Sequence, residues 1–229
     1  MPDAKAALVI GAGDATGGAI ARRFAREGFT ACVTRRNADK LSPLVQRIEA
    51  EGGRVRAFGS DARREEQMVA LIETIEREEG PIEVAVYNVG GNVRFPIRKT
   101  TARVYFKVWE MCAFGGFLMG REVAKAMVPR GRGTILFTGA TASLRGSANF
   151  APFAIAKFGL RALAQSMARE LGPKGIHVAH VVIDGQIGEA EGDTELNPVD
   201  IAEAYWSLYR QPRSAWTLEA DLRTWVEKF

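Results

Sequence analysis

Short apolar segments alternate with longer amphipathic segments along this chain. Segments of five or six residues rich in Val, Ile and Ala are typical of strands that are buried on both faces, and the longer segments have helical periodicity. The strand-like segments are 6–10, 30–34, 54–58, 83–88, 134–138, 177–182 and 219–223. This alternation predicts an α/β fold, a doubly wound parallel sheet of about seven strands covered by helices on both faces in three layers.

Glycines mark the ends of several helix-like segments. Gly52, Gly80 and Gly172 follow amphipathic segments, and proline directly follows the last two glycines, which is a usual C-terminal stop signal. Residues 101–127 form one long, heavily apolar segment that predicts a single helix. We find no linker, repeat or low-complexity tract, so residues 1–229 are expected to form one domain, with a short lid after the sixth strand and an aromatic C-terminal tail.

Composition and charge narrow the class of protein. A chain of 229 residues that is 47% hydrophobic is long enough for one packed core. No apolar run reaches the roughly 18 residues of a membrane span. Cys32 and Cys112 lie far apart in sequence, which predicts neither a disulfide nor a metal site. The net charge is +4, but basic and acidic residues are interleaved. We therefore expect a cytoplasmic protein that binds neither nucleic acid nor membrane.

The first strand leads into a glycine-rich turn and then a helix. Gly11 and Gly13 allow the backbone to approach a pyrophosphate, and Gly17 allows the helix to pack close to the sheet, while free N–H groups at the helix start face the phosphates. Thr16 stands where G-x-G-x-x-G has its third glycine, so a plain tight turn stays open as an alternative. The order of elements favours a Rossmann-like dinucleotide site formed by Gly11, Gly13, Asp14, Ala15, Thr16 and Gly17.

The second strand is followed by two arginines, Arg35 and Arg36. An NAD site usually offers Asp or Glu to the ribose hydroxyls here, whereas arginine suits a 2′-phosphate. This pair favours NADP over NAD. Two points argue against it: the arginines could be an ordinary solvated pair, and the Asp14 carboxylate in the turn would repel a 2′-phosphate.

Several landmarks together resemble the short-chain dehydrogenase/reductase family over residues 6 to about 190. The segment "IGAGDATG" is similar to the family's T-G-x-x-x-G-x-G, with Ile10 and Ala15 as departures. The resemblance implies that Asp61 in "FGSDA" contacts the adenine. It also implies that Asn88 and Gly90 in "YNVG", which is similar to the family's N-N-A-G, support the sheet and the cofactor.

The resemblance also assigns the catalytic positions. The family's Asn, Ser, Tyr and Lys align with Cys112, Ala140, Phe153 and Lys157, so only the lysine is kept. In the family the tyrosine transfers the substrate proton, the serine hydrogen-bonds the carbonyl, and the lysine hydrogen-bonds the nicotinamide ribose. Phenylalanine has no exchangeable proton and alanine no donor. We therefore expect a degenerate active site in which Lys157 still binds the cofactor.

Other residues could supply the missing proton transfer, although a structural role is favoured for each. By proximity in the family's layout the candidates are Asp184, Glu189, Tyr87, Tyr105 and His180. Thr138, Thr141 and Ser143 carry hydroxyls near the serine position. Because side chains alternate along a strand, we expect these three to point elsewhere.

Two functions follow from these residues. The first is an NAD(P)-dependent oxidoreductase of this family that acts on a small-molecule substrate with atypical catalytic residues. The second is a non-catalytic sensor or scaffold protein that binds NADP. The resemblance further implies a homodimer or homotetramer that pairs through the helix predicted at 101–127.

Overall fold

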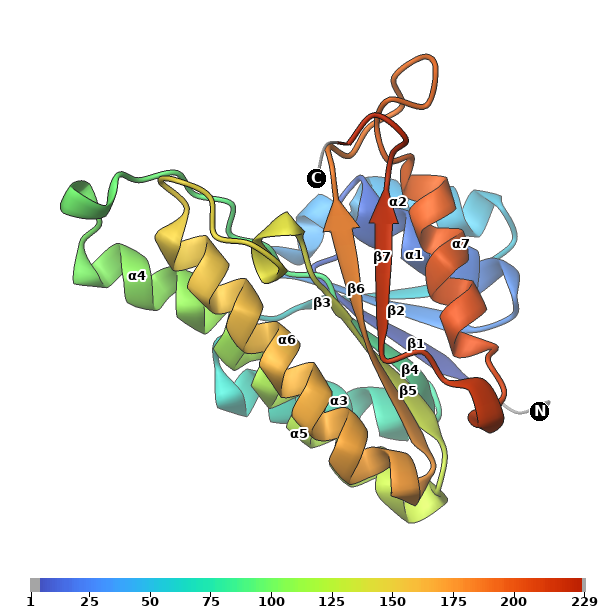
Figure 1. The fold of residues 1–229 in the computed structure, drawn as a ribbon. Helices are drawn as coiled ribbons and strands as arrows, with labels where there is room; N and C mark the ends of the chain where they lie inside the picture. Colours follow the sequence, from blue (N-terminus) through green and yellow to red (C-terminus); the bar gives the residue numbers. More distant parts are fainter. Residues whose placement is uncertain (1–4, 228–229) are drawn as a thin grey trace.

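One parallel sheet forms the centre of the computed structural model, which describes residues 5–227 (Figure 1). The strands are β1 (Ala6–Ile10), β2 (Thr30–Arg35), β3 (Arg54–Gly59), β4 (Ile82–Tyr87), β5 (Gly133–Thr138), β6 (Ile176–Asp184) and β7 (Glu219–Arg223). Their order is β3-β2-β1-β4-β5-β6-β7, and each neighbouring pair is parallel. The predicted fold class is confirmed.

Helices cover both faces of the sheet and enclose two apolar cores (Figure 1). One face carries α1 (Thr16–Arg26), α2 (Ser42–Ala50) and α7 (Pro198–Tyr209). The other carries α3 (Glu65–Glu78), α4 (Ala102–Trp109), α5 (Gly115–Met127) and α6 (Ala151–Leu171). Along β1, Leu8 and Ile10 enter one core while Ala7 and Val9 enter the other, because side chains alternate along a strand. None of the helices within residues 5–227 is long and apolar enough to cross a membrane.

The single helix predicted at 101–127 is interrupted. A π-helical turn at Glu110–Phe114 separates α4 from α5, and the Gly115 N–H donates to the Glu110 carbonyl five residues back. The Tyr87 hydroxyl donates to the Met111 carbonyl at 2.6 Å, so that carbonyl has a partner outside the helix. A side chain that inserts into the helical ladder is a usual cause of such a turn.

Aromatic rings fix α7 against α1. The Phe24 ring meets Phe29, Trp206 and Tyr209 edge to face, with ring centroids 5.4 to 5.7 Å apart. Such pairs stabilise a core beyond the apolar area that they bury. Phe24 is fully buried, so this cluster determines how the last helix covers the amino-terminal half of the sheet.

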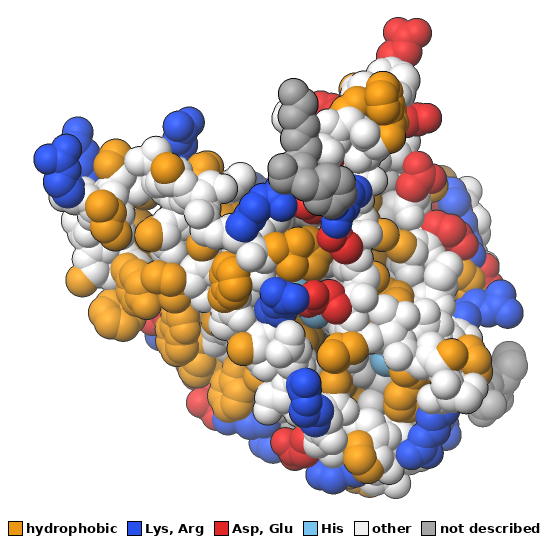
Figure 2. Space-filling model, viewed as in Figure 1, with side chains coloured by type: hydrophobic (Ala, Val, Ile, Leu, Met, Phe, Trp, Pro, Cys, Tyr) orange, Lys and Arg blue, Asp and Glu red, His pale blue; other side chains and the backbone are white. Residues whose placement is uncertain are grey.

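Two protrusions flank a hollow on the face shown in Figure 2. The segment that leads from β4 into α4 forms one protrusion, where blue Lys and Arg side chains gather. The segment between β6 and α7 forms the other, where red Asp and Glu side chains gather. Residues 92–107 contain five cations and no acid, while residues 189–195 contain four acids and no cation. The two sides of the hollow therefore differ in charge.

We predict that Phe24→Ala lowers the free energy of unfolding by about 3 to 5 kcal/mol, because it leaves a cavity in the cluster that holds α7. Urea denaturation followed by circular dichroism measures the change. Ile97→Ala, at a position that is 72% exposed, is the control and should stay within about 0.5 kcal/mol of the wild type. Equal effects at the two positions would contradict the prediction.

Candidate cofactor and active site

The candidate site lies at the carboxyl ends of the central strands. The sheet order reverses between β1 and β4, and open α/β sheets bind ligands at such a switch point. A cavity of about 560 Å³ opens there, between the two protrusions of Figure 2. Its lining from the glycine turn and the β4 end is Gly11, Gly13, Asp14, Ala15, Thr16, Gly17, Asn88, Val89, Gly90 and Asn92. Its lining from the β5, α6 and β6 ends is Thr138, Gly139, Ala140, Thr141, Ala142, Ser147, Phe150, Phe153, Lys157, Ile183, Gly185 and Ile187.

The glycine turn has no room for side chains at two positions. Gly11 has φ of +83°, a conformation that favours glycine. A Cβ on Gly17 would lie 2.6 Å from the Gly11 carbonyl oxygen, so this glycine permits the close packing of α1 on the turn. A Cβ on Gly13 would meet nothing within 4 Å, so the space beside Gly13 is open to a ligand.

The start of α1 has unpaired hydrogen-bonding groups beside this space. Its N-cap is Ala15, which has no side-chain oxygen to cap the helix, and the first N–H groups of a helix have no partner within it. The Thr16 hydroxyl is buried and has no hydrogen-bond partner among the described residues. Phosphate oxygens accept hydrogen bonds and are favoured by the positive end of the helix dipole. The turn therefore fits the pyrophosphate of a dinucleotide.

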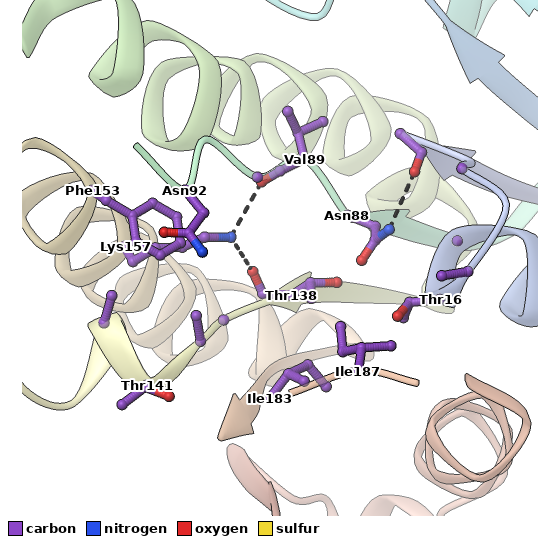
Figure 3. Close-up of a pocket in the computed structure, with 18 of the residues that line it drawn as sticks. Thr16, Asn88, Val89, Asn92, Thr138, Thr141, Phe153, Lys157, Ile183 and Ile187 are labelled. Carbon is purple, nitrogen blue, oxygen red and sulfur yellow. Dashed lines mark hydrogen bonds between the residues drawn. The ribbon is translucent and has the colours of Figure 1, made fainter. Parts of the chain in front are cut away.

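The Asn88 side chain holds the turn against the end of β4. Its Nδ2 donates to the Gly11 carbonyl at 3.2 Å, shown as a dashed line in Figure 3, and its backbone N–H donates to the Ile10 carbonyl at 2.9 Å. Gly90, two residues later, lines the cavity. This contact links the phosphate-binding turn to the segment that leads toward Lys157.

A second cavity of about 290 Å³ adjoins the first and shares Gly11, Gly13 and Gly90 with it. Arg35 and Arg36 line this second cavity. The Arg35 Nη1 lies 3.8 Å from the Asp14 carboxylate and donates to the Lys40 carbonyl. Arg36 is exposed and has no hydrogen bond or ion pair with described residues. The Asp14 charge is therefore partly compensated, and Arg36 is the arginine whose donors are free for a ligand.

Asp61 lines the second cavity next to Ser60. The Arg63 guanidinium donates to both Asp61 carboxylate oxygens at 2.6 and 2.9 Å, and this hydrogen bonding lowers the pKa of Asp61 despite partial burial. The Ser60 hydroxyl is buried without a partner among residues 5–227. The Asp61 carboxylate and the unpaired Ser60 hydroxyl therefore lie together where the family resemblance predicts the adenine of the cofactor.

Lys157 projects from α6 into the first cavity and is only 2% exposed. Its Nζ donates to the Thr138 carbonyl at 2.8 Å and to the Val89 carbonyl at 3.2 Å (Figure 3). Burial lowers the pKa of Lys157, since desolvation disfavours the charged form. Three donors on one ammonium leave capacity for a further acceptor in the cavity.

Comparison with known proteins shows which family this chain belongs to. The short chain dehydrogenase family profile matches residues 5–188. The chain belongs to the short-chain dehydrogenase family.

A short-chain dehydrogenase from Rhodopseudomonas palustris is 53% identical, with a TM-score of 0.89 over 97% of this chain and 99% of that chain. A metagenomic short-chain oxidoreductase, solved in complex with NADP, is 25% identical over 96% of this chain and 97% of that chain, with a TM-score of 0.88. Gluconate 5-dehydrogenase from Gluconobacter oxydans is 28% identical over 92% of this chain and 81% of its own length.

Three of the four positions that the sequence resemblance assigns to the family's catalytic residues line the first cavity: Ala140, Phe153 and Lys157. The Lys157 ammonium lies 5.8 Å from the centre of the Phe153 ring. Cys112 lies in the π-helical turn and packs with Phe153 in a small apolar cluster behind the cavity wall. Burial raises the pKa of the Cys112 thiol. The side chains present around Lys157 are therefore mainly apolar.

The five alternative proton donors take different places in this short-chain dehydrogenase. Tyr105 and Glu189 do not line the first cavity. Tyr87 is buried beneath the π-helical turn, where desolvation raises its pKa. His180 is buried, with its Nδ1 3.0 Å from the Glu219 carboxylate. Asp184 is buried directly behind the cavity wall, where its carboxylate accepts from Thr141.

The expectation that the hydroxyls near Ala140 point elsewhere is wrong for Thr141. This residue lines the cavity, and its hydroxyl donates to Asp184 at 2.5 Å. Strand alternation fails here because β5 ends at Thr138 and residues 141–143 form a 3₁₀ turn. The Thr138 hydroxyl bonds Tyr205 in the core, and Ser143 is buried. Asn92 and Ser147 also line the cavity and carry no motif in the sequence that would have identified them.

No group of three or more His, Cys, Asp or Glu side chains suited to a metal ion occurs among residues 5–227. His177 and His180, which the sequence places on opposite strand faces, have separate partners. The His177 Nε2 lies 2.8 Å from the Thr217 carbonyl, and the His180 Nδ1 contacts Glu219.

We predict that stability falls as pH decreases from about 6.5 to about 4, because burial lowers the pKa of His180 to about 4. In this window the unfolded chain binds a proton that the folded chain excludes, which costs up to roughly 3 kcal/mol. Urea denaturation of the wild type and of His180→Asn, at about pH 7 and about pH 5, measures the difference. The variant should lose less stability between the two conditions than the wild type, and an equal loss would contradict the prediction.

Proposed function

We propose that this protein is an NADP(H)-dependent oxidoreductase that acts on a small-molecule substrate. The supporting observation is that one cavity joins the phosphate-binding turn to Lys157. The turn residues from Gly11 to Gly17 would hold the pyrophosphate, and Lys157 would hydrogen-bond the nicotinamide ribose. When bound, the cofactor supplies or accepts the hydride. The substrate then occupies the part of the cavity between Phe150, Phe153 and Ile187.

Arg36 is the residue that we propose to select NADP over NAD. It is exposed beside the second cavity and makes no hydrogen bond or ion pair with the described residues, while Arg35 lies 3.8 Å from the Asp14 carboxylate. Guanidinium groups bind phosphate with strong, charge-assisted hydrogen bonds. The metagenomic relative was solved with NADP, which supports the same preference here.

We predict that Arg36→Ala weakens NADPH binding about tenfold, equivalent to roughly 1.4 kcal/mol, and leaves NADH binding unchanged. Isothermal calorimetry and nicotinamide fluorescence measure both affinities. Arg47→Ala, which removes an arginine outside both cavities, is the control and should bind both cofactors like the wild type. If the wild type binds neither cofactor, the proposed function is wrong.

We propose further that the active site is degenerate relative to the family. Ala140 and Phe153 have no exchangeable proton, and the buried thiol of Cys112 lies outside the cavity lining. A positioned proton donor contributes about 10² to 10⁴ in rate, and one donor to a developing oxyanion about 10² to 10³. Carbonyl reduction by the family's usual route should therefore be very slow.

We predict that the double variant Phe153→Tyr with Ala140→Ser increases NADPH-dependent carbonyl reduction by at least tenfold, because it restores both hydroxyls beside Lys157. A panel of aldehydes and ketones assayed by NADPH absorbance measures the gain. The matched control is Phe106→Tyr with Ala38→Ser, which adds the same hydroxyls outside the cavity and should give no gain. If the active-site double variant reduces carbonyls no faster than the wild type, more than two hydroxyls are missing.

The missing hydroxyls at positions 140 and 153 also support a second candidate, a non-catalytic NADP-binding sensor or scaffold protein. Tight NADPH binding without turnover of any aldehyde, ketone or alcohol would favour it. Turnover that is lost in Lys157→Ala would exclude it, provided that cofactor affinity is measured separately in that variant.

We propose that two or four copies assemble through the face formed by α4, α5 and α6. Large apolar side chains are exposed along it: Phe106, Trp109, Phe117, Ile155 and Phe158. Figure 2 shows orange side chains gathered over this part of the molecule. Exposed apolar patches of this kind are typical of protein interfaces.

A further inference from the structure

A hydroxyl and a carboxylate meet at the wall of the first cavity. The Thr141 hydroxyl donates to Asp184 Oδ1 at 2.5 Å. Thr141 lines the cavity and lies below Phe153 in the view of Figure 3, whereas Asp184 is 1% exposed and does not line the cavity. The pair joins the 3₁₀ turn after β5 to the end of β6, so two elements hold it in place.

Among the described residues, Arg145 is a cation that pairs with the Asp184 carboxylate. The guanidinium of Arg145 approaches it at 3.4 and 3.5 Å, and Arg145 also pairs with Glu227 at 3.5 Å. On β7 the opposing residue is Arg223, which pairs with Asp221. Strong charge-assisted hydrogen bonds are about 2.7 to 2.9 Å long, so the Thr141 hydroxyl is the closest partner of this buried carboxylate.

This arrangement fixes the direction of the hydrogen bond. A carboxylate can only accept, so the single proton of the Thr141 hydroxyl points to Asp184. The lone pairs that remain on the Thr141 oxygen can accept a hydrogen bond from the cavity. A ligand hydroxyl is a suitable donor, whereas a carbonyl oxygen would meet another acceptor.

Other polar groups around this part of the cavity are less suited to remove a proton. Lys157 donates to two backbone carbonyls, and the buried Ser143 hydroxyl accepts from the Ala140 N–H. Ser147 and Asn92 line the cavity, and neither side chain hydrogen-bonds a carboxylate within residues 5–227. Among the described lining residues, Thr141 is therefore the one with a hydroxyl bound to a buried carboxylate.

We propose that Thr141 and Asp184 act together as the proton acceptor for oxidation of an alcohol in this cavity. This inference rests on the proposed function, in which a bound NADP⁺ would supply the acceptor for the hydride of the alcohol carbon. As that C–H bond breaks and the carbonyl bond forms, the alcohol O–H gives its proton to the Thr141 oxygen. The Thr141 proton passes to Asp184, and Asp184 later releases it to solvent.

The first test reads the carboxylate directly and requires no turnover. Infrared difference spectra are recorded on addition of cyclohexanol, with the NADP⁺-loaded protein and with the protein alone. We expect a shift of a carboxylate band that is absent from Asp184→Asn and from Thr141→Val and is restored in Thr141→Ser. Methoxycyclohexane, which has no hydroxyl to donate, should cause no shift. No shift in the wild type, or an equal shift in Thr141→Val, would overturn the proposal.

The second test is kinetic and uses cyclohexanol oxidation with NADP⁺. Thr141→Val and Asp184→Asn should each lower kcat by about 10²- to 10⁴-fold. Thr74→Val and Asp200→Asn make the same chemical changes outside both cavities and serve as controls. Calorimetry with NADP⁺ separates the two possible failures. If the wild type does not bind NADP⁺, the proposed function fails. If both site variants bind NADP⁺ normally and keep the wild-type kcat, Thr141 and Asp184 do not accept the proton and the proposal is wrong.

Discussion

The candidate site depends on one buried cation, the Lys157 ammonium, and on the two carbonyls that accept its hydrogen bonds. An ammonium in a low-dielectric environment is costly unless polar groups surround it. Here the Thr138 carbonyl at the end of β5 and the Val89 carbonyl after β4 compensate it. The same two bonds tie α6 to the end of β5 and to the segment after β4, beside the cavity. The lysine is therefore a structural element of the cavity as well as a candidate ligand of the cofactor.

Burial and hydrogen bonding shift the pKa of Lys157 in opposite directions. Desolvation lowers its pKa, while the carbonyl oxygens that surround it favour the protonated form. An aromatic face adds to that compensation, because the Phe153 ring centre lies 5.8 Å from Nζ. The Phe153 ring thus has no exchangeable proton to transfer but can still stabilise the cation.

The sequence predicted the features that depend on local patterns. All seven strands appear within about two residues of their predicted bounds, since apolar runs between amphipathic segments are a strong signal of buried parallel strands. The glycine turn, Arg36, Asp61 and Lys157 all line the two adjoining cavities, because a βα turn and the ends of neighbouring parallel strands meet at one edge of the sheet.

The features that the sequence missed depend on contacts between distant segments. The π-helical turn is associated with a hydrogen bond from Tyr87, 24 residues earlier, and no helical periodicity reveals such a contact. The position of Thr141 was mistaken because a period of two applies only while the strand continues. Its partner Asp184 lies 43 residues later, on a strand that becomes its neighbour only through the order of the sheet.

The polarity of the side chains around the first cavity limits the chemistry that can take place in it. A site with free donors near the reacting carbon favours a ligand that gains negative charge, whereas a site with free acceptors favours a ligand that gives up a proton. Phe153 carries no hydroxyl, while the Thr141 hydroxyl has its proton directed to Asp184. In the proposed reaction the Thr141 oxygen and Asp184 would take the proton of an alcohol during oxidation and return it to the carbonyl during reduction, because both directions pass through the same transition state.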